Sequence, residues 1–262
     1  MKKTLIVFLL LFLFALGVGV FVFLGKGKSQ ISDPHLLKIK KEGKIVIGTD
    51  ATFPPFEFLN ENGEIVGFDI DLGTEIAKDL KVNAEFKNIP WDELFFALER
   101  GEVDLILAGV TITLERAEKM DFSKPYFNAG QIIVTKKEKL DLIKTPEDVR
   151  GKTIGVQRNT TGEEKAKELT DPSLVIGFDD YQKAIEALIE DRVEIVLVDF
   201  PTGVELVKKD PNLTLIGEPL TNEFYGVVVK KGEKALLEKV NTTIDRLKTQ
   251  GILKDLERKW LR

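Results

Sequence analysis

The sequence predicts an α/β protein with two lobes, each built on a mostly parallel sheet flanked by helices. From Lys44 onward, short apolar runs alternate with helical patterns, which is typical of parallel sheets with helices on their faces. One unit also occurs twice: Ala97–Gly109 aligns without gaps with Ala187–Asp199, each a helix end, a tight turn and a buried strand. The body of about 235 residues is long enough for two such lobes.

Short apolar runs bounded by turn residues are the expected strands. Taken in order, they are Lys44–Thr49, Ala84–Asn88, Leu105–Ala108, Gln131–Thr135, Thr153–Val156, Leu174–Phe178, Ile195–Val198, Leu213–Ile216 and Gly226–Lys230. Helical patterns lie between them at Asp69–Leu80, Trp91–Arg100, Gly162–Leu169, Tyr181–Glu190, Pro201–Lys208 and Lys234–Gln250. A further helix is expected to start at Thr145–Asp148, where a capping hydroxyl precedes proline and two acids.

The N-terminus has the pattern of an export signal. Two lysines follow Met1, and residues 5–24 carry no charge. Ala15–Gly17 offers a cleavage site of small residues, so we favour a cleaved signal peptide over residues 1–24, with an uncleaved membrane anchor as the alternative. Residues 25–34 then form a linker rich in Lys, Gly and Ser. Either fate places the body outside the cytoplasmic membrane, soluble after cleavage or tethered by the apolar segment.

Composition excludes several classes of function. The sequence has no cysteine, so it forms no disulfide and carries no lipid-modified leader cysteine. Without the two leader lysines, 36 basic and 43 acidic residues give a net charge of −7. These charges are interspersed without a basic stripe, which argues against a nucleic-acid partner. The single histidine, His35, has no cluster of possible ligands around it, so we expect neither a metal site nor a cofactor.

The first candidate site residues follow the strand expected at Lys44–Thr49. Asp50 comes directly after it, at the carboxyl end where open α/β sheets bind their ligands. The two prolines within Phe53–Phe56 then stiffen the loop, because proline fixes its own φ and keeps the preceding residue extended.

The second motif combines small, hydroxyl and cationic residues after the strand that begins at Leu105. Gly109 and Thr111 follow this strand, and Thr113 is a plausible helix N-cap that puts Arg116 in the first turn. A cation there opposes the helix dipole, so an anion nearby is expected. The alternative is a surface arginine that pairs with Glu115 or Glu118.

The second lobe supplies its own candidates. The loop Gln157–Gly162 joins a strand to a helix, whose N-terminal N–H groups can receive an anion. Asp199 ends the buried run Ile195–Val198, where a structural strand rarely leaves a charge. Its alternative role is to cap the helix that begins at Phe200. The two sets of strand ends predict a cleft between the lobes.

These motifs resemble the extracellular solute-binding proteins of family 3, periplasmic proteins that capture polar or basic amino acids for ABC importers. The resemblance runs from about Lys44 to Trp260 and is greatest to binders of arginine, lysine, histidine and glutamine. It implies the periplasmic-binding-protein fold with a two-strand hinge. Lobe 1 would comprise residues 35–129 plus 226–262, and lobe 2 residues 130–225, with crossings at Ala129–Gln131 and Tyr225–Val227.

The resemblance also implies how the α-carboxylate and α-ammonium of an amino acid are bound. The arginine at the Arg116 position grips the carboxylate, which Thr161 contacts from the second lobe. Asp199, Gly109 and Thr111 hold the ammonium.

The side chain of the ligand falls to the remaining residues. The resemblance implies that Asp50 contacts the distal polar end of the ligand side chain, and that the aromatic rings of Phe53 and Trp91 pack on either side of it. Read alone, Trp91 could equally be a core residue. Glutamine binders of the family tend to carry a lysine where this chain has Gln157. The absence of that lysine removes a positive charge from the pocket and favours a cationic ligand. Glu57 is a possible further acid, without a spacing argument that brings it to the cleft.

The expected function is therefore the substrate-binding component of an ABC amino-acid importer. It would capture a basic L-amino acid, preferably arginine, by hinge closure and present it to membrane permease subunits. Binding of glutamine or another polar amino acid is the main alternative. A cyclohexadienyl-dehydratase-like enzyme is disfavoured, because Asp50 would repel the second carboxylate of its substrate. A sensor domain of a signalling protein is disfavoured because no second membrane span follows.

Overall fold

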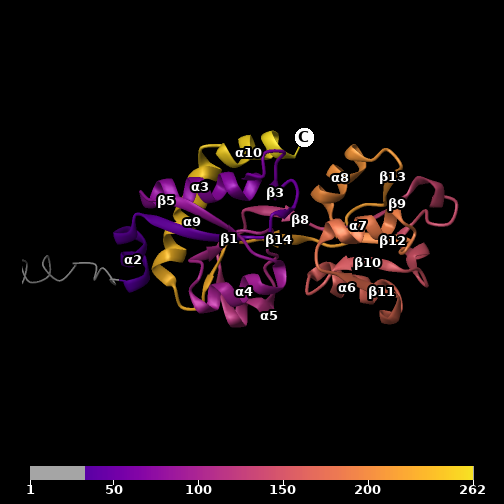
Figure 1. Cartoon of the computed structure of the whole chain (residues 1–262), viewed down its shortest axis with the longest axis horizontal. Coiled ribbons are helices and arrows are strands. Elements are labelled where there is room, and N and C mark those ends of the chain that lie inside the picture. Colours follow the sequence, from indigo (N-terminus) through magenta and orange to yellow (C-terminus); the bar gives the residue numbers. More distant parts are fainter. Residues whose placement is uncertain (1–32, 262) are drawn as a thin grey trace, which may run out of the picture. The chain divides into compact units, whose positions relative to one another are not determined.

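The computed structural model describes residues 33–261, and its core consists of two five-stranded sheets with helices around each (Figure 1). The first sheet has the strand order β5-β1-β6-β15-β7 and the second β11-β10-β12-β9-β13. The predicted leader, and the linker up to residue 32, lie outside the described residues. None of the helices within 33–261 is long and apolar enough to cross a membrane.

Both sheets repeat one pairing pattern: the second strand in the order is parallel to both of its neighbours, and the fourth strand runs in the opposite direction. In the first sheet β1 (Lys44–Thr49) is parallel to β5 (Asn83–Asn88) and β6 (Leu105–Ile106). β15 (Val228–Lys230) is antiparallel to β6 and to β7 (Met120–Phe122).

The second sheet has the same arrangement. β10 (Ile154–Gln157) is parallel to β11 (Val175–Phe178) and β12 (Ile195–Asp199). β9 (Gln131–Lys136) is antiparallel to β12 and to β13 (Leu213–Ile216). The predicted α/β class with mostly parallel sheets is confirmed, and the gap-free internal repeat corresponds to α4–β6 in one sheet and α7–β12 in the other.

The helices lie close to their predicted bounds. Around the first sheet are α3 (Phe68–Leu80), α4 (Trp91–Arg100) and α9 (Lys234–Thr249), and around the second are α6 (Thr161–Leu169), α7 (Tyr181–Ile189) and α8 (Phe200–Lys209) (Figure 1). Each buries an apolar face, as α7 does with Tyr181, Ile185 and Leu188. Amphipathic periodicity therefore located these helices correctly.

The short helix α5 (Leu114–Lys119) begins after its predicted cap, Thr113. Several other elements were missed, the strands among them because two or three residues are too few for a periodic pattern. These are α2 (Pro34–Glu42), α10 (Ile252–Trp260), β2 (Thr52–Phe53), β3 (Glu57–Leu59), β4 (Ile65–Val66) and β7. The linker prediction was wrong at its end, since Asp33 caps α2 and Pro34 begins it. The helix expected from Thr145 is a 3₁₀ helix over Pro146–Val149 with a capping box.

The chain passes between the sheets through two short strands that pair with each other. β8 (Phe127–Ala129) leads from β7 into β9, and β14 (Glu223–Tyr225) leads from β13 back to β15. They form a two-stranded antiparallel sheet in which Glu223 is opposite Ala129. Next to it, a Cβ atom on Gly130 would lie 2.3 Å from the carbonyl oxygen of Thr221, so only glycine fits this crossing.

Candidate functional site

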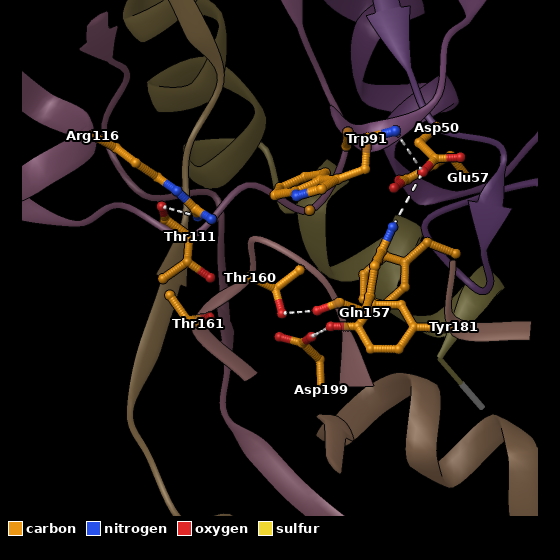
Figure 2. A pocket seen from close by; sticks show the side chains of 13 residues that line it. Asp50, Glu57, Trp91, Thr111, Arg116, Gln157, Thr160, Thr161, Tyr181 and Asp199 are labelled. Carbon is orange, nitrogen blue, oxygen red and sulfur yellow. Dashed lines mark hydrogen bonds between the residues drawn. The ribbon is translucent and has the colours of Figure 1, made fainter. Parts of the chain in front are cut away.

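All nine residues predicted for the site line one pocket between the two sheets (Figure 2). The strand ends explain this convergence. Asp50 follows β1, and Gly109 follows β6; Gln157 and Asp199 end β10 and β12. Because β1 and β6 are parallel neighbours, as are β10 and β12, their carboxyl ends meet at one edge of each sheet. The lining comprises Asp50, Phe53, Trp91, Gly109, Thr111, Arg116, Gln157, Thr161 and Asp199, together with Glu57, Ala108, Thr160 and Tyr181.

One end of the pocket is acidic (Figure 2). Asp50 accepts hydrogen bonds from the Trp91 backbone N–H (3.1 Å), the Thr52 hydroxyl (3.0 Å) and the Gln157 amide (3.4 Å). Glu57 is 1% exposed, and its Oε2 has no hydrogen-bond partner among the described residues. Burial raises the pKa of Asp50 and raises that of Glu57 well above its usual range. No cation within the described residues forms an ion pair with either group, so burial favours their protonated forms.

Gly109 is held in the conformation that the site needs by a buried acid below the pocket. Its φ of +54° lies in the left-handed region that favours glycine, and a Cβ atom there would lie 2.8 Å from the Phe53 ring. The N–H of Gly109 donates to Asp69 (2.9 Å), which also accepts from the Tyr126 hydroxyl (2.7 Å). Burial raises the pKa of Asp69 to about 6.

Arg116 lies at the end of the pocket opposite the acids (Figure 2). Thr113 caps α5 by accepting from the Arg116 N–H (3.1 Å), as predicted. The guanidinium donates to the carbonyl oxygens of Thr111 (3.0 Å) and Asn159 (3.3 Å) and lies 5.4 Å from the centre of the Trp91 ring. The alternative of a surface pair with Glu115 is not observed, because Glu115 pairs with Lys119. Burial lowers the pKa of Arg116.

Asp199 is oriented by two tyrosines. It accepts from the hydroxyl groups of Tyr225 (2.7 Å) and Tyr181 (3.3 Å), and it is 5% exposed. Although it occupies the N-cap position of α8, its side chain makes no capping hydrogen bond, so the alternative structural role is not observed. Burial, and then the nearby charge of Glu223, raise the pKa of Asp199 to about 7.

Aromatic rings cover the pocket from both lobes. Phe53 stacks on Tyr181 at a centroid distance of 5.1 Å and on Phe56 at 5.6 Å. Trp91 lines the pocket and also packs in a core cluster with Leu94, so its two proposed roles coexist. The stacking of Phe53 on Tyr181 joins residues from the two lobes directly beside the site.

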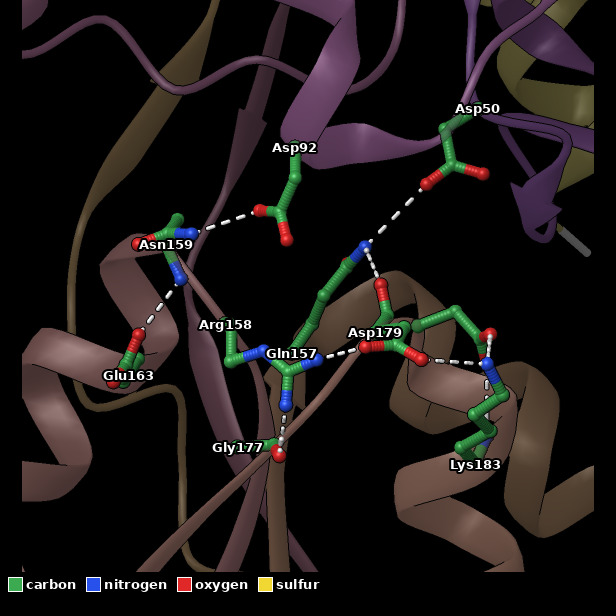
Figure 3. A network of polar contacts seen from close by, with 10 residues as sticks. Asp50, Asp92, Gln157, Arg158, Asn159, Glu163, Gly177, Asp179 and Lys183 are labelled. Atoms are coloured by element: carbon green, nitrogen blue, oxygen red, sulfur yellow. Dashed lines mark hydrogen bonds and ion pairs between the residues drawn. The ribbon is translucent and has the colours of Figure 1, made fainter.

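Polar contacts also join the lobes at the pocket (Figure 3). The carbonyl oxygen of Asn159 accepts from the Trp91 indole N–H (3.1 Å) and from Arg116, while its side-chain amide donates to Asp92 (2.8 Å). Gln157 reaches from β10 to Asp50. Asn159 adopts a positive φ of 58°, which asparagine tolerates better than most residues. The lobes are thus in contact around the site.

Sequence reasoning missed four residues of the pocket lining or left them open: Glu57, Ala108, Thr160 and Tyr181. Thr160 could have been inferred from its position beside Thr161. Glu57 and Tyr181 reach the site through tertiary packing that no local pattern announces. Away from the pocket, His35 forms ion pairs with Asp104 and Glu233, which the sequence did not indicate. No group of three or more His, Cys, Asp or Glu within residues 33–261 is arranged to hold a metal ion.

Comparison with known proteins identifies the architecture. The family model of the bacterial extracellular solute-binding proteins, family 3, matches residues 45–262. The chain belongs to this family. The L-cystine-binding protein TcyJ of Escherichia coli K12 is 34% identical over 89% of this chain and 88% of that protein.

Solved structures agree with this assignment. The arginine-bound form of truncated ArgBP from T. maritima is 40% identical, with a TM-score of 0.77, over 80% of this chain and 99% of that one. Ancestral arginine-binding proteins have been solved with arginine (42% identity, TM-score 0.79, over 84% of this chain and 99% of that one) and with glutamine (43%, 0.79, over 83% and 97%). The two-lobed fold of the solute-binding proteins, which the resemblance implied, is confirmed.

Proposed function

We propose that this solute-binding protein captures a basic L-amino acid, arginine above all, and delivers it to the permease of an ABC importer. The observation that carries the proposal is the charge of the pocket lining: three carboxylates, from Asp50, Glu57 and Asp199, and one guanidinium, from Arg116. A basic amino acid carries two cationic groups and one carboxylate. Its charges therefore complement this lining better than those of a neutral or acidic amino acid.

The α-carboxylate of the ligand would pair with Arg116, whose guanidinium can form two parallel hydrogen bonds with it. The backbone N–H groups at the start of α6, from Thr161 onward, would approach the same carboxylate from the second lobe. The α-ammonium would lie against Asp199, Gly109 and Thr111. This orientation is supported by the position of Arg116 opposite the acidic end (Figure 2).

The side chain of the ligand would extend towards Asp50 and Glu57. A guanidinium offers five N–H donors, so it can satisfy the unpartnered oxygen of Glu57 and the carboxylate of Asp50 together. Phe53 and Trp91 would each add a cation–π attraction of about 0.5–2 kcal/mol. We expect a Kd between micromolar and nanomolar, which corresponds to about −8 to −12 kcal/mol.

Glutamine is the second candidate, and one contact favours it. The Gln157 amide donates to Asp50, so this carboxylate can accept a hydrogen bond from an amide, as it would from the side chain of a glutamine ligand. A protein related to this one has been solved with glutamine bound, and another relative is named for cystine. Glutamine would bring no cation to Asp50 and Glu57, which is why we place arginine first.

We further propose that capture proceeds by closure of lobe 2, residues 130–225, onto lobe 1, residues 35–129 plus 226–262. The paired strands β8 and β14, next to the crossings, would absorb the rotation. Closure would exclude water and strengthen each charged contact. A dehydratase activity is not proposed, because a second substrate carboxylate would meet Asp50 and Glu57. We expect the protein to act outside the cytoplasmic membrane, as its family does.

A binding panel tests the proposed function. The chain from Gly25 to Arg262 would be unfolded and refolded to remove carried-over ligand, then titrated calorimetrically with the twenty standard amino acids and ornithine. We expect arginine to bind most tightly, with lysine weaker and glutamine weaker still. Tightest binding of glutamine would keep the class of function and change the ligand. Failure of every ligand to bind would overturn the proposal.

A further inference from the structure

A buried carboxylate behind the pocket wall accepts hydrogen bonds from pocket residues of both lobes. Glu223, on the crossing strand β14, is 9% exposed and does not line the pocket itself. Its Oε2 atom accepts from the hydroxyl of Thr111 (2.9 Å), in the loop after β6, and from the hydroxyl of Thr161 (2.6 Å), at the start of α6. Figure 2 shows these two threonines near Arg116.

Glu223 is itself held rigidly. Its Oε1 accepts from the hydroxyl of Thr221 (2.7 Å), which in turn accepts from the backbone N–H of Gln131 (2.9 Å). The backbone of Glu223 is fixed by the pairing of β14 with β8, opposite Ala129. Both carboxylate oxygens are therefore occupied by hydroxyl donors, and the side chain is anchored on the segment that joins the lobes.

This arrangement decides what the two pocket threonines can offer a ligand. An ionised carboxylate only accepts hydrogen bonds, whereas a threonine hydroxyl has one hydrogen and two lone pairs. When Thr111 and Thr161 both give their hydrogen to Glu223, their oxygens present only lone pairs to the pocket. Lone pairs suit an ammonium group and do not suit a carboxylate. At Thr161, the group left to receive a ligand carboxylate is the backbone N–H.

We propose that Glu223 is a positioning residue for recognition of the α-ammonium: it turns the hydroxyl of Thr111 into an acceptor for the amino group of the ligand, and it takes up the hydroxyl hydrogen of Thr161, which leaves only the backbone N–H there for the carboxylate. This inference rests on the proposed amino-acid binding and goes beyond it. The charge of Glu223 acts in the same direction, because it lies near Asp199, the proposed direct partner of the ammonium. Glu223 does not touch the ligand in this account.

Ligands that lack one group each provide the test. Glu223→Gln, Glu223→Asp and the wild type would be titrated calorimetrically with arginine, with agmatine, which lacks the carboxylate, and with 5-guanidinopentanoate, which lacks the ammonium. We expect Glu223→Gln to weaken arginine and agmatine about 10- to 100-fold, as for a lost hydrogen bond to a charged group, and guanidinopentanoate by no more than about twofold. Glu223→Asp keeps the charge but is too short to hold both hydroxyls, so it should also weaken arginine. The matched control is Glu218→Gln, an exposed acid nearby.

A double-mutant cycle covers the case in which a truncated ligand binds too weakly to measure. If Glu223 acts through the hydroxyl, its substitution should weaken arginine much less in a Thr111→Val background than in the wild type. Equal weakening of all three ligands, or additive effects in the cycle, would overturn the inference and make Glu223 a general support for the closed form. If the wild type binds arginine and Glu223→Gln binds it with the same affinity, only this inference is overturned. A wild type that binds no amino acid overturns the proposed function with it.

Discussion

Two groups of buried or half-buried acids in this protein differ in whether the chain provides a cation to pair with them. Asp104 and Glu233 both contact the imidazole of His35, through which α2 is attached to the first sheet. The hydrogen bond to Asp104 is the main reason that the pKa of His35 is raised to about 9, and the charged imidazole in turn helps to lower that of Asp104. Here the chain supplies its own cation.

The pocket acids have no such partner within the described residues. Asp50 and Asp199 accept hydrogen bonds from neutral hydroxyl, amide and backbone N–H groups, and one oxygen of Glu57 accepts none. The pKa values of these three acids are raised, mainly by burial. The first group therefore stabilises the fold, whereas the second has the features of a binding site and, under the proposed function, receives its cation from the ligand.

The largest effect is expected at the one guanidinium of the pocket. Arg116→Ala should weaken every amino acid by about 30-fold to several thousand-fold, the cost of removing one partner of a buried charge pair. Arg116→Lys should recover part of this loss, because it keeps the charge without the two-pronged geometry. Calorimetry on both variants measures it. Unchanged affinity in Arg116→Ala would show that the α-carboxylate of the ligand does not pair with Arg116 and that the proposed orientation is wrong.

The acidic end should control selectivity and not general affinity. Asp50→Asn and Glu57→Gln should each weaken arginine about 10- to 100-fold, as expected for a charged hydrogen bond. Glutamine should change far less, because an amide ligand does not need the charge. The ratio of the two Kd values reports the effect. A parallel loss of both ligands would indicate damage to the pocket and refute a specific role for these acids.

The pocket should also respond to pH. Because the pKa of Asp199 is about 7 without a cation, a ligand ammonium that favours the carboxylate must displace a proton. Arginine affinity should therefore fall as pH drops below 7, by up to about tenfold per pH unit for one proton. Titrations at pH 5.5, 6.5 and 7.5 test this, and Asp199→Asn should flatten the profile. Affinity that is constant across this range in the wild type would argue against contact between Asp199 and the ammonium.

The His35 group should show the opposite behaviour, with an effect on stability and none on binding. Because the folded-state pKa of His35 lies above its usual 6.5, its contribution is fully present below pH 6.5 and is lost as pH rises through about 9. His35→Gln should lower the free energy of unfolding by about 1–2 kcal/mol at pH 6 and by less at pH 9.5. Urea unfolding measures this difference. A change in the arginine affinity of His35→Gln would contradict the proposal that the two groups of acids have separate roles.

Sequence alone predicted the fold class, the longer helices and strands, and a set of site residues that the structure brings to one pocket. The helices, the strands and the site residues at strand ends and caps were predictable because these are local signals, whereas Phe53 and Trp91 were assigned through the resemblance to the family. Glu57, Tyr181 and Glu223 were not predicted because their roles depend on tertiary neighbours. Glu57 becomes a pocket acid only when β3 packs beside Asp69. Glu223 contacts the site only because β14 passes between two threonines that are distant in sequence. His35 escaped for the same reason, since its partners are 69 and 198 residues away in sequence.

The comparison of arginine with citrulline tests the central claim most directly. The two ligands share the α-carboxylate, the α-ammonium and nearly the same shape, but citrulline carries a neutral ureido group in place of the guanidinium. Calorimetric titration of the refolded protein should give arginine an affinity at least about 100-fold higher, because two pocket acids gain a cation. Equal affinity for the two ligands would contradict the claim that these acids await the charge of the ligand.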